Sequence, residues 1–351
     1  MEPGELRHYI RKIDRDNNIG LVRYILAFGV LISHFNILCG AHVPWLVTNY
    51  DRVGGFFTLS GFLLLTPILK GIKFKKFAIK RAWRLLPSYL FVVIVFACAL
   101  SCLSELSFSE YFASKGFWEY LAANISFLNF LHPDLPGVFT DLEINAVNGA
   151  LWTMKVEWVL TLSIPIVIWL VKKYHLKLRR TVTVIIVMSL VYRLVFMILY
   201  DNTENEIYEI LGRQFGGQSL YFYGGILIYT FYEEIKQRKI WFILSSLIFY
   251  IIFRCIDFIP LYYVVLHPFV ISLLVISFSI IPGKFIEYID RGNNISYEIY
   301  LCHFPVMQVM AHFKMIECFG VAASLTAGIV TTILLAIIVY SSVGRLYKSH
   351  K

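Results

Sequence analysis

Apolar stretches, most of them close to 20 residues long, alternate with short polar segments along nearly the whole chain. The stretches lie at about residues 19–39, 52–70, 88–104, 150–172, 180–200, 218–233, 240–255, 260–281, 295–313 and 320–341. A helix of about 20 apolar residues is long enough to cross the hydrocarbon core of a bilayer. The pattern therefore predicts an all-α, polytopic membrane protein, built as a bundle of about ten transmembrane helices.

Lysine and arginine residues indicate which ends of these spans face the cytoplasm. With the N-terminus inside, 24 of the 32 basic residues fall in inner segments and five in outer segments, while Arg23, Lys155 and Arg193 fall within spans. Cytoplasmic segments of membrane proteins are enriched in basic residues, so both termini are predicted to be cytoplasmic. Residues 1–351 are expected to form a single integral-membrane domain, with 1–18 as its N-terminal segment and 343–351 as its tail.

The composition narrows the classes of function. Hydrophobic residues make up 58% of the chain and charged residues 16%, with a mean hydropathy of +0.68. The net charge of +9 follows the predicted topology, so we expect the lipid bilayer as a partner and no nucleic acid. The six cysteines have no metal-type spacing, which predicts no metal site. A disulfide among Cys39, Cys255 and Cys318 is the alternative to free thiols.

Two segments permit more than one structural interpretation. The outer segment 105–149 contains an aromatic stretch, Phe117 to Phe130, that is expected to form an interfacial or a re-entrant helix. The second span contains the run Gly54–Phe62, whose small residues favour close helix packing or a close approach of a ligand to the backbone. Near the span ends, His267 and His312 are expected to be solvated and to have no functional role.

Two polar residues fall inside the first span. Arg23 and His34 are eleven positions apart, so both side chains lie on one helix face, roughly 16 Å apart along the axis. Titratable groups at membrane depth are costly and are usually functional. His34 is a candidate general base, the alternative being a hydrogen bond to a neighbouring helix. Arg23 is a candidate anchor for an anionic group, the alternative being snorkelling to the inner headgroups.

Two further spans open with polar residues. Glu157 lies about two turns into the fourth span, where a carboxylate must pair or lose its charge. Its expected structural partner is Arg193 or Arg23. In the ninth span Ser296, Tyr300 and His303 recur on one helix face, followed by Pro305, which is expected to kink the helix.

The inner segment before the third span carries a dense basic motif. Lys80, Arg81 and Arg84 are followed by Pro87 at the entrance of the span. These side chains either set the topology by attraction to anionic lipid or hold a phosphorylated cytoplasmic ligand, because arginine pairs well with phosphate.

Taken in order, these elements resemble the membrane-bound acyltransferase family 3, whose members have roughly ten spans and O-acylate sugars. The resemblance covers about residues 17–342. It rests on five elements: Arg23 with His34, the run Gly54–Phe62, the motif from Lys80 to Pro87, Leu151-Trp152 through Glu157, and Ser296-Tyr297 through His303 and Pro305. The chain departs from the family pattern at Lys80, where arginine is expected, at Thr153, where serine is more usual, and at Lys155.

The resemblance implies an enzyme of the bacterial plasma (inner) membrane that transfers an acyl group, most often acetyl from acetyl-CoA, to a sugar hydroxyl. The acceptor would be a lipid-linked or exported glycan. The implied catalytic residues are His34 as general base, Glu157 as the group that orients it, and His303 or Tyr300 at the oxyanion or the acceptor. Lys80, Arg81 and Arg84 would hold the CoA phosphates, and Arg23 would guide the donor inward.

Other interpretations stay open at this point. A membrane transporter of a small anion or glycan would use the same polar intramembrane residues, although no internal repeat supports it. A structural partner in polysaccharide assembly would need none of them. Direct transfer and a two-step transfer through an acetylated His34 are both compatible with the sequence, as is a homo-oligomer.

Overall fold

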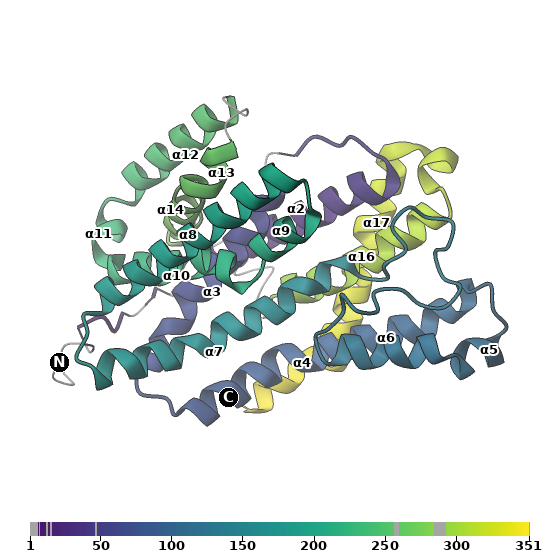
Figure 1. Ribbon diagram of the computed structural model, residues 1–351, viewed down its shortest axis with the longest axis horizontal. Coiled ribbons are helices and arrows are strands. Elements are labelled where there is room, and N and C mark those ends of the chain that lie inside the picture. Colours follow the sequence, from purple (N-terminus) through teal and green to yellow (C-terminus); the bar gives the residue numbers. More distant parts are fainter. Residues whose placement is uncertain are drawn as a thin grey trace. The chain divides into compact units, whose positions relative to one another are not determined.

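The computed structural model describes residues 6, 8–11, 13–14, 16–45, 48–255, 260–283 and 293–350. The regular elements of this part of the chain are helices, and none of these residues forms a strand (Figure 1). Helix α2 begins at Ile19, whose backbone N–H donates to Asn17 Oδ1 over 3.0 Å. The predicted all-α class is confirmed.

Six helices in the described part of the chain are long and apolar enough to cross a membrane. These are α2 (Ile19–Cys39), α3 (Asn49–Leu69), α4 (Phe74–Ala99), α7 (Trp152–Lys173), α8 (Leu178–Thr203) and α17 (Met315–Ser342). Four other predicted spans coincide with shorter helices: α10 (Phe215–Thr230), α12 (Lys239–Cys255), α14 (His267–Ser279) and α16 (Ser296–His312). The chain is therefore an integral membrane protein.

Shorter helices lie between these elements and, in the case of η3, after the last of them. The number of helices in the described part of the chain is therefore not ten. These shorter helices are η1 (Leu100–Leu103), α5 (Phe108–Ala113), α6 (Lys115–Ile125), η2 (Gly149–Leu151), α9 (Glu206–Gly212), α11 (Tyr232–Gln237), α13 (Pro260–Val265) and η3 (Gly344–His350). The eighth predicted span, at 260–281, is divided between α13 and α14. The cytoplasmic location of both termini stays a prediction.

Among the predicted span starts, two differ most from the structure. The third span was expected to begin at residue 88, but α4 begins at Phe74, because the polar residues before the span are good helix formers and continue the helix. The basic motif from Lys80 to Arg84 therefore lies on a helix rather than in a loop. The tenth span was expected to begin at 320; α17 begins at Met315, with a break at Gly320, where φ is 76°.

The contacts of the chain group it into two compact units. Unit 1 comprises Met1–Leu26, Tyr50–Phe77 and Val156–Gly292, and unit 2 comprises Ala27–Asn49, Ala78–Lys155 and Asn293–Lys351. Helices α2, α4 and α7 each contribute residues to both units. The expectation of a single domain stays a prediction.

In unit 1, α3 and α10 approach each other closely enough for their backbones to touch. A Cβ atom on Gly61 would lie 1.9 Å from the carbonyl oxygen of Phe222, and one on Gly225 would lie 2.1 Å from that of Thr58. A Cβ atom on Gly54 would lie 2.4 Å from the ring of Tyr221. The small residues of the run Gly54–Phe62 therefore serve helix packing, the first of the two explanations that the sequence offered.

A buried polar network also holds unit 1 together. Asp51, at the start of α3, contacts His267 Nε2 with Oδ1 and accepts a hydrogen bond from Tyr250 with Oδ2 over 2.7 Å. The Tyr221 hydroxyl lies 3.0 Å from His267 Nδ1. Asp51 and His267 are each only 1% exposed. The expectation of a solvated His267 is therefore wrong: α14 begins inside the unit, where Asp51 supplies the polar partner that water would otherwise provide.

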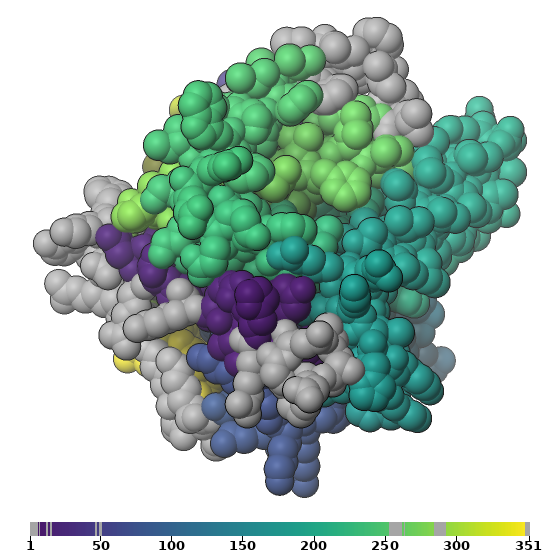
Figure 2. Space-filling view, turned by 90° about the vertical axis from the view of Figure 1, so that its left-hand side faces the viewer, coloured from purple at the N-terminus to yellow at the C-terminus, as the bar shows by residue number. Residues whose placement is uncertain are grey.

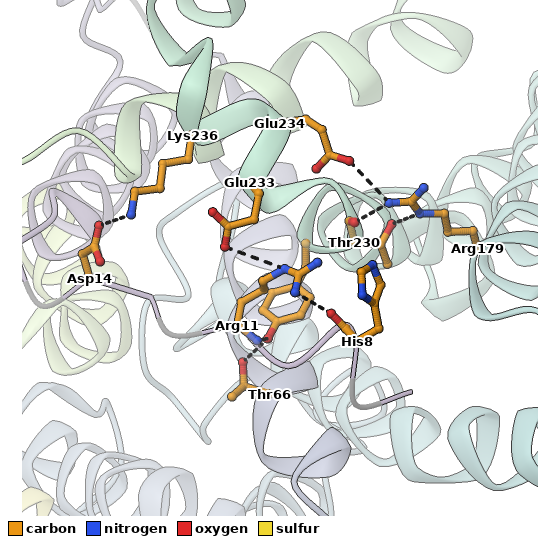
Figure 3. A network of polar contacts seen from close by, with 10 residues as sticks. His8, Arg11, Asp14, Thr66, Arg179, Thr230, Glu233, Glu234 and Lys236 are labelled. Atoms are coloured by element: carbon orange, nitrogen blue, oxygen red, sulfur yellow. Dashed lines mark hydrogen bonds and ion pairs between the residues drawn. The ribbon is translucent and has the colours of Figure 1, made fainter. Parts of the chain in front are cut away.

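The N-terminal segment of unit 1 is tied to α11 by ion pairs (Figure 3). Arg11 lies 3.9 Å from Glu233, and Lys236 lies 2.7 Å from Asp14. Hydrogen bonding to Asp14 raises the pKa of Lys236. Figure 2 shows the purple atoms of this segment lying against the green atoms of α11 and α12. Charge complementarity thus fixes the chain just before it enters the first span.

Residue Arg179 terminates α10 in the same network (Figure 3). Its guanidinium donates to the Thr230 carbonyl over 2.6 Å and to the Thr230 hydroxyl over 3.1 Å, and it lies 3.8 Å from Glu234. A cation at the C-terminus of a helix satisfies carbonyls that have no partner within the helix. This contact ends α10 at Thr230.

In unit 2, α16 packs along α17 (Figure 1). Gly328 makes room for the partner helix, because a Cβ atom there would lie 2.8 Å from Met310 Sδ. An apolar cluster surrounds this contact: Leu31, Ile32 and Phe35 of α2, Ala41 just after it, and Val306, Met307 and Met310 of α16. The cluster holds the second half of α2 against α16.

The aromatic stretch of the outer segment forms α6, which packs along α4. Tyr111, just before α6, donates to the Ala97 carbonyl over 2.7 Å, and Tyr89 donates to the Asn124 carbonyl over 2.6 Å. Phe127 stacks on Tyr89 at 4.8 Å between ring centroids. Ala97 and Tyr89 are eight residues apart, about 12 Å along α4. The choice between an interfacial and a re-entrant helix stays a prediction.

We expect Gly61→Ala to destabilise the protein, because the added methyl would collide with the Phe222 carbonyl oxygen. Overpacking of this kind costs about 1–3 kcal/mol or more. Thermal unfolding of the detergent-purified protein should show a lower apparent Tm. Gly212→Ala is the matched control, since its Cβ atom would lie at an ordinary 3.5 Å from Phe196 Cβ. Equal Tm values for both variants would contradict the backbone contact.

Candidate active site

Two histidines of unit 2 face each other across α2 and α16. His34 Nδ1 lies 2.8 Å from His303 Nε2, and the ring centroids are 5.0 Å apart. His303 is completely buried and His34 is half-buried. The edge contact of Phe304 with His34, at 4.9 Å between centroids, restricts the ring further. Helix packing thus brings together two site residues that the sequence placed 269 positions apart.

A backbone carbonyl determines how protons are arranged in this histidine pair. His303 Nδ1 lies 2.7 Å from the carbonyl oxygen of Tyr300, and since a carbonyl only accepts, we assign the proton of neutral His303 to Nδ1. His303 Nε2 then carries a lone pair, which accepts from His34 Nδ1–H. In the neutral pair the basic lone pair of His34 is therefore on Nε2.

The segment of α16 that carries His303 is shaped by Pro305. A proline has no N–H, so the carbonyl of Leu301, four residues earlier, loses its helical partner. Asn148 replaces it: Nδ2 donates to the Leu301 carbonyl over 2.9 Å, while Oδ1 accepts from the Ala150 N–H over 3.3 Å. Such a replacement is required where no water satisfies the backbone. Asn148 therefore joins the start of α7 to the histidine helix.

The neighbouring glycine makes that junction possible. A Cβ atom on Gly149 would lie 2.8 Å from the ring of Phe304, so a larger residue would push η2 away from α16. The sequence did not indicate Asn148 or Gly149 as site residues, because neither is charged and their partner is a backbone atom. Pro305 was the available signal, since a proline inside a span predicts a donor beside the freed carbonyl.

Tyr300 contributes to the site through its hydroxyl and its carbonyl. The hydroxyl lies 2.7 Å from Thr153 Oγ1 and 2.9 Å from the carbonyl oxygen of Ala150, so it fastens α16 to the beginning of α7. Tyr300 is buried at this contact. Its proposed place at the oxyanion stays a prediction, whereas the effect of its carbonyl on His303 was not anticipated.

A basic cluster lies on the first turns of α4 in unit 2. Lys80, Arg81 and Arg84 are half-buried, and the spacing i, i+4 places Lys80 and Arg84 on one side of the helix. Arg84 Nη1 lies 3.8 Å from Oε1 of Glu298, which also accepts from the Ser88 hydroxyl over 2.9 Å. Glu298 is completely buried. Glu298 is an intramembrane carboxylate in the same sense as Glu157, although it was not predicted as a site residue.

The other end of α16 holds an outer segment of the chain. Gln308 donates to the carbonyls of Ile144 and Ala146 over 2.6 and 2.7 Å, and His312 Nδ1 lies 2.9 Å from Asp141 Oδ1. Hydrogen bonding from His312 lowers the pKa of the Asp141 carboxyl. His312 thus makes a structural contact, which helps to fasten the segment that leads to Asn148, and the expectation that it has no functional role stays a prediction.

Two predicted site residues fall in unit 1. Arg23 is on the first part of α2, eleven residues before His34, and Glu157 is on α7, where Oε1 accepts from the Thr161 hydroxyl over 3.3 Å. Their roles at the active site stay predictions.

Metal-ligating side chains do not gather in groups of three or more His, Cys, Asp or Glu within the described ranges. The thiols of Cys39, Cys98, Cys102, Cys302 and Cys318 are free. The alternative of a disulfide between Cys39 and Cys318 is therefore wrong, and the side chain of Cys255 lies outside the described residues.

Comparisons with known proteins point to one family. The model of the acyltransferase domain of acyltransferase family 3 matches residues 16–341. The O-acetyl transferase of Shigella phage Sf6 is 26% identical over 149 residues, a region that covers 41% of this chain and 43% of that relative. The matched region is thus less than half of the relative's length. No solved structure matches significantly.

We expect Asn148→Ala to destabilise unit 2, because the Leu301 carbonyl would be buried without a donor. Such a loss costs about 1–3 kcal/mol. The apparent Tm of the purified variant should fall, and activity should fall with it if His303 shifts. Asn145→Ala is the control, since Asn145 is exposed in the same segment. An Asn148→Ala variant as stable as this control would show that the junction is unimportant.

Proposed function

The chain belongs to acyltransferase family 3, and from this premise we propose that it is an O-acetyltransferase that transfers acetyl from acetyl-CoA to the hydroxyl of a sugar. The observation that carries the proposal is the His34–His303 pair, in which the Tyr300 carbonyl places the basic lone pair on His34 Nε2. The phage relative, an O-acetyl transferase by name, supports the choice of acyl group.

The proposed reaction uses that lone pair twice. His34 Nε2 takes the proton of the sugar hydroxyl as the oxygen attacks the thioester carbonyl carbon. The carbon–sulfur bond then breaks, the ester is left on the sugar, and the proton passes from His34 to the departing thiolate, which gives free CoA. His303 accepts a hydrogen bond from His34 Nδ1–H throughout and so supports the transient positive charge on the imidazole.

A two-step route is the alternative chemistry at the same nitrogen. His34 Nε2 would itself attack the thioester and carry the acetyl group until the sugar hydroxyl displaces it. Both routes require an unprotonated Nε2, so the hydrogen-bond arrangement of the pair supports either.

The basic cluster of α4 supports a nucleotide donor. Lys80, Arg81 and Arg84 offer cationic groups to phosphates, and Arg84 contacts Glu298 of α16. Glu298 and His303 are five residues apart on that helix, about 7.5 Å along the axis. We infer that the phosphates bind at the cluster while the long pantetheine arm carries the thioester along α16 toward His34. Arg23 would guide the donor, and Glu157 would orient the base.

The location and the acceptor follow from the same proposal. The protein would work in the bacterial plasma (inner) membrane, with the donor arriving from the cytoplasm and the acceptor being a lipid-linked or exported glycan. His34 lies 15 residues into α2, past the middle of the helix, which supports approach of the acceptor from the outer side. A transporter built on the same groups would move substrate without consuming acetyl-CoA.

We expect His34→Ala to reduce transfer from labelled acetyl-CoA by at least about a hundredfold, because the general base is lost. The measurement uses purified protein with glycan acceptor from cells that contain the gene. His42→Ala is the matched control, since His42 is an exposed histidine of the following segment. Transfer by His34→Ala at the rate of this control would remove His34 from the mechanism, and uptake of glycan without donor consumption would favour a transporter.

A further inference from the structure

The guanidinium of Arg84 is enclosed by groups from two parts of unit 2, α16 and the C-terminal segment. It lies over the ring of Tyr297 at 5.7 Å and over the ring of Tyr347 at 4.8 Å, and it is 3.8 Å from Glu298. Tyr297 is itself fixed, because its hydroxyl donates to the Leu85 carbonyl over 2.9 Å. Rings on a guanidinium limit its movement and leave its edges to donate.

Tyr347 belongs to the C-terminal segment, which is in close contact with the same carboxylate. A Cβ atom on Gly344 would lie 3.0 Å from Glu298 Oε1 and 3.2 Å from the Ser88 hydroxyl. The chain therefore leaves α17 directly against Glu298. Three residues later it places Tyr347 on Arg84. The segment is thus built into the basic cluster.

The polar groups of the cluster are incompletely satisfied. Arg84 Nη1 and Glu298 Oε2 are buried and have no hydrogen-bond partner among the described residues. Nη1 faces Glu298 on the buried side, and a phosphate oxygen is a suitable acceptor for the remaining N–H groups of the half-buried guanidinium. With Lys80, Arg81 and Arg345 also in this region, one buried carboxylate does not balance the positive charge. The cluster is suited to a polyanionic ligand.

We propose that the C-terminal segment 344–347 forms part of the donor site, where Tyr347 covers the Arg84 guanidinium and holds it in position for a phosphate group of the acyl-CoA donor. This inference rests on the proposed function. Glu298 fixes Arg84 from the buried side, and Tyr347 fixes it from the side of the tail. Tyr347 is thus a binding residue at the entrance for the nucleotide and takes no part in the chemistry at His34.

The test measures coenzyme A binding to the full-length protein in phosphatidylcholine nanodiscs. We expect Tyr347→Ala to raise the Kd about fivefold, the size of a cation–π contact worth about 1 kcal/mol. Tyr347→Phe keeps the ring and should stay within about twofold of the wild type. In turnover the Tyr347→Ala variant should raise the KM for acetyl-CoA and leave kcat unchanged. A loss of folding would instead lower the fraction of active protein.

The matched control is Tyr174→Ala. Tyr174 is an exposed tyrosine that covers Lys173 at 5.3 Å, so it is the same kind of contact at another basic segment. Its removal should leave coenzyme A binding unchanged. If Tyr347→Ala and Tyr174→Ala both bind coenzyme A like the wild type, the tail has no part in the donor site.

A second measurement tests the role of Tyr347 even if the Tyr347→Ala variant is poorly folded. In a Tyr347→Cys variant, coenzyme A should slow alkylation of that cysteine, as read by mass spectrometry of the C-terminal peptide. Unchanged alkylation would overturn the role of Tyr347 in the donor site but would leave the proposed donor in place. A wild type that binds no coenzyme A would remove the proposed donor as well. Protection by phosphatidylglycerol nanodiscs but not by coenzyme A would show that the phosphate belongs to a lipid.

Discussion

The hydrogen bond between His303 Nδ1 and the Tyr300 carbonyl decides what the site can do. Because a carbonyl only accepts, the proton of His303 is fixed on Nδ1. The 2.8 Å contact between His303 Nε2 and His34 Nδ1 then requires His34 Nδ1–H to be the donor. Without it, His34 could carry its proton on either nitrogen, and only one arrangement presents Nε2 as a base. A buried imidazole with an assigned lone pair is what separates a catalytic histidine from one that merely joins two helices.

The rest of unit 2 keeps that carbonyl and that ring in place. Pro305 removes one helical hydrogen bond beside the pair, and Asn148 restores it from the start of α7. The Tyr300 hydroxyl fastens the same two helices, and Gln308 holds the outer segment that leads into α7. These contacts involve neutral groups and backbone atoms, which are inexpensive to bury once paired. The ion pair of Arg84 with the buried Glu298 lies near the start of α16, five residues before His303.

The apolar pattern was sufficient to predict the membrane class and the approximate position of each span, because bilayer thickness sets helix length. It was also sufficient to single out His34 and His303 by their unusual depth. It did not reveal Asn148, whose partner is a backbone oxygen created by a distant proline, nor the pairing of His267 with Asp51, which depends on how α3 and α14 pack. It also placed the basic motif in a loop, since hydropathy does not register a helix that continues into water.

The central claim is that the basic lone pair of His34 lies on Nε2. Nitrogen-15 NMR of the protein in nanodiscs, labelled at the histidine ring nitrogens and assigned with a His34→Gln variant, tests it without any substrate. Both rings should be protonated at Nδ1, with a scalar coupling across the hydrogen bond from His34 Nδ1–H to His303 Nε2. A neutral His34 protonated at Nε2, or a His303 protonated at Nε2, would contradict it.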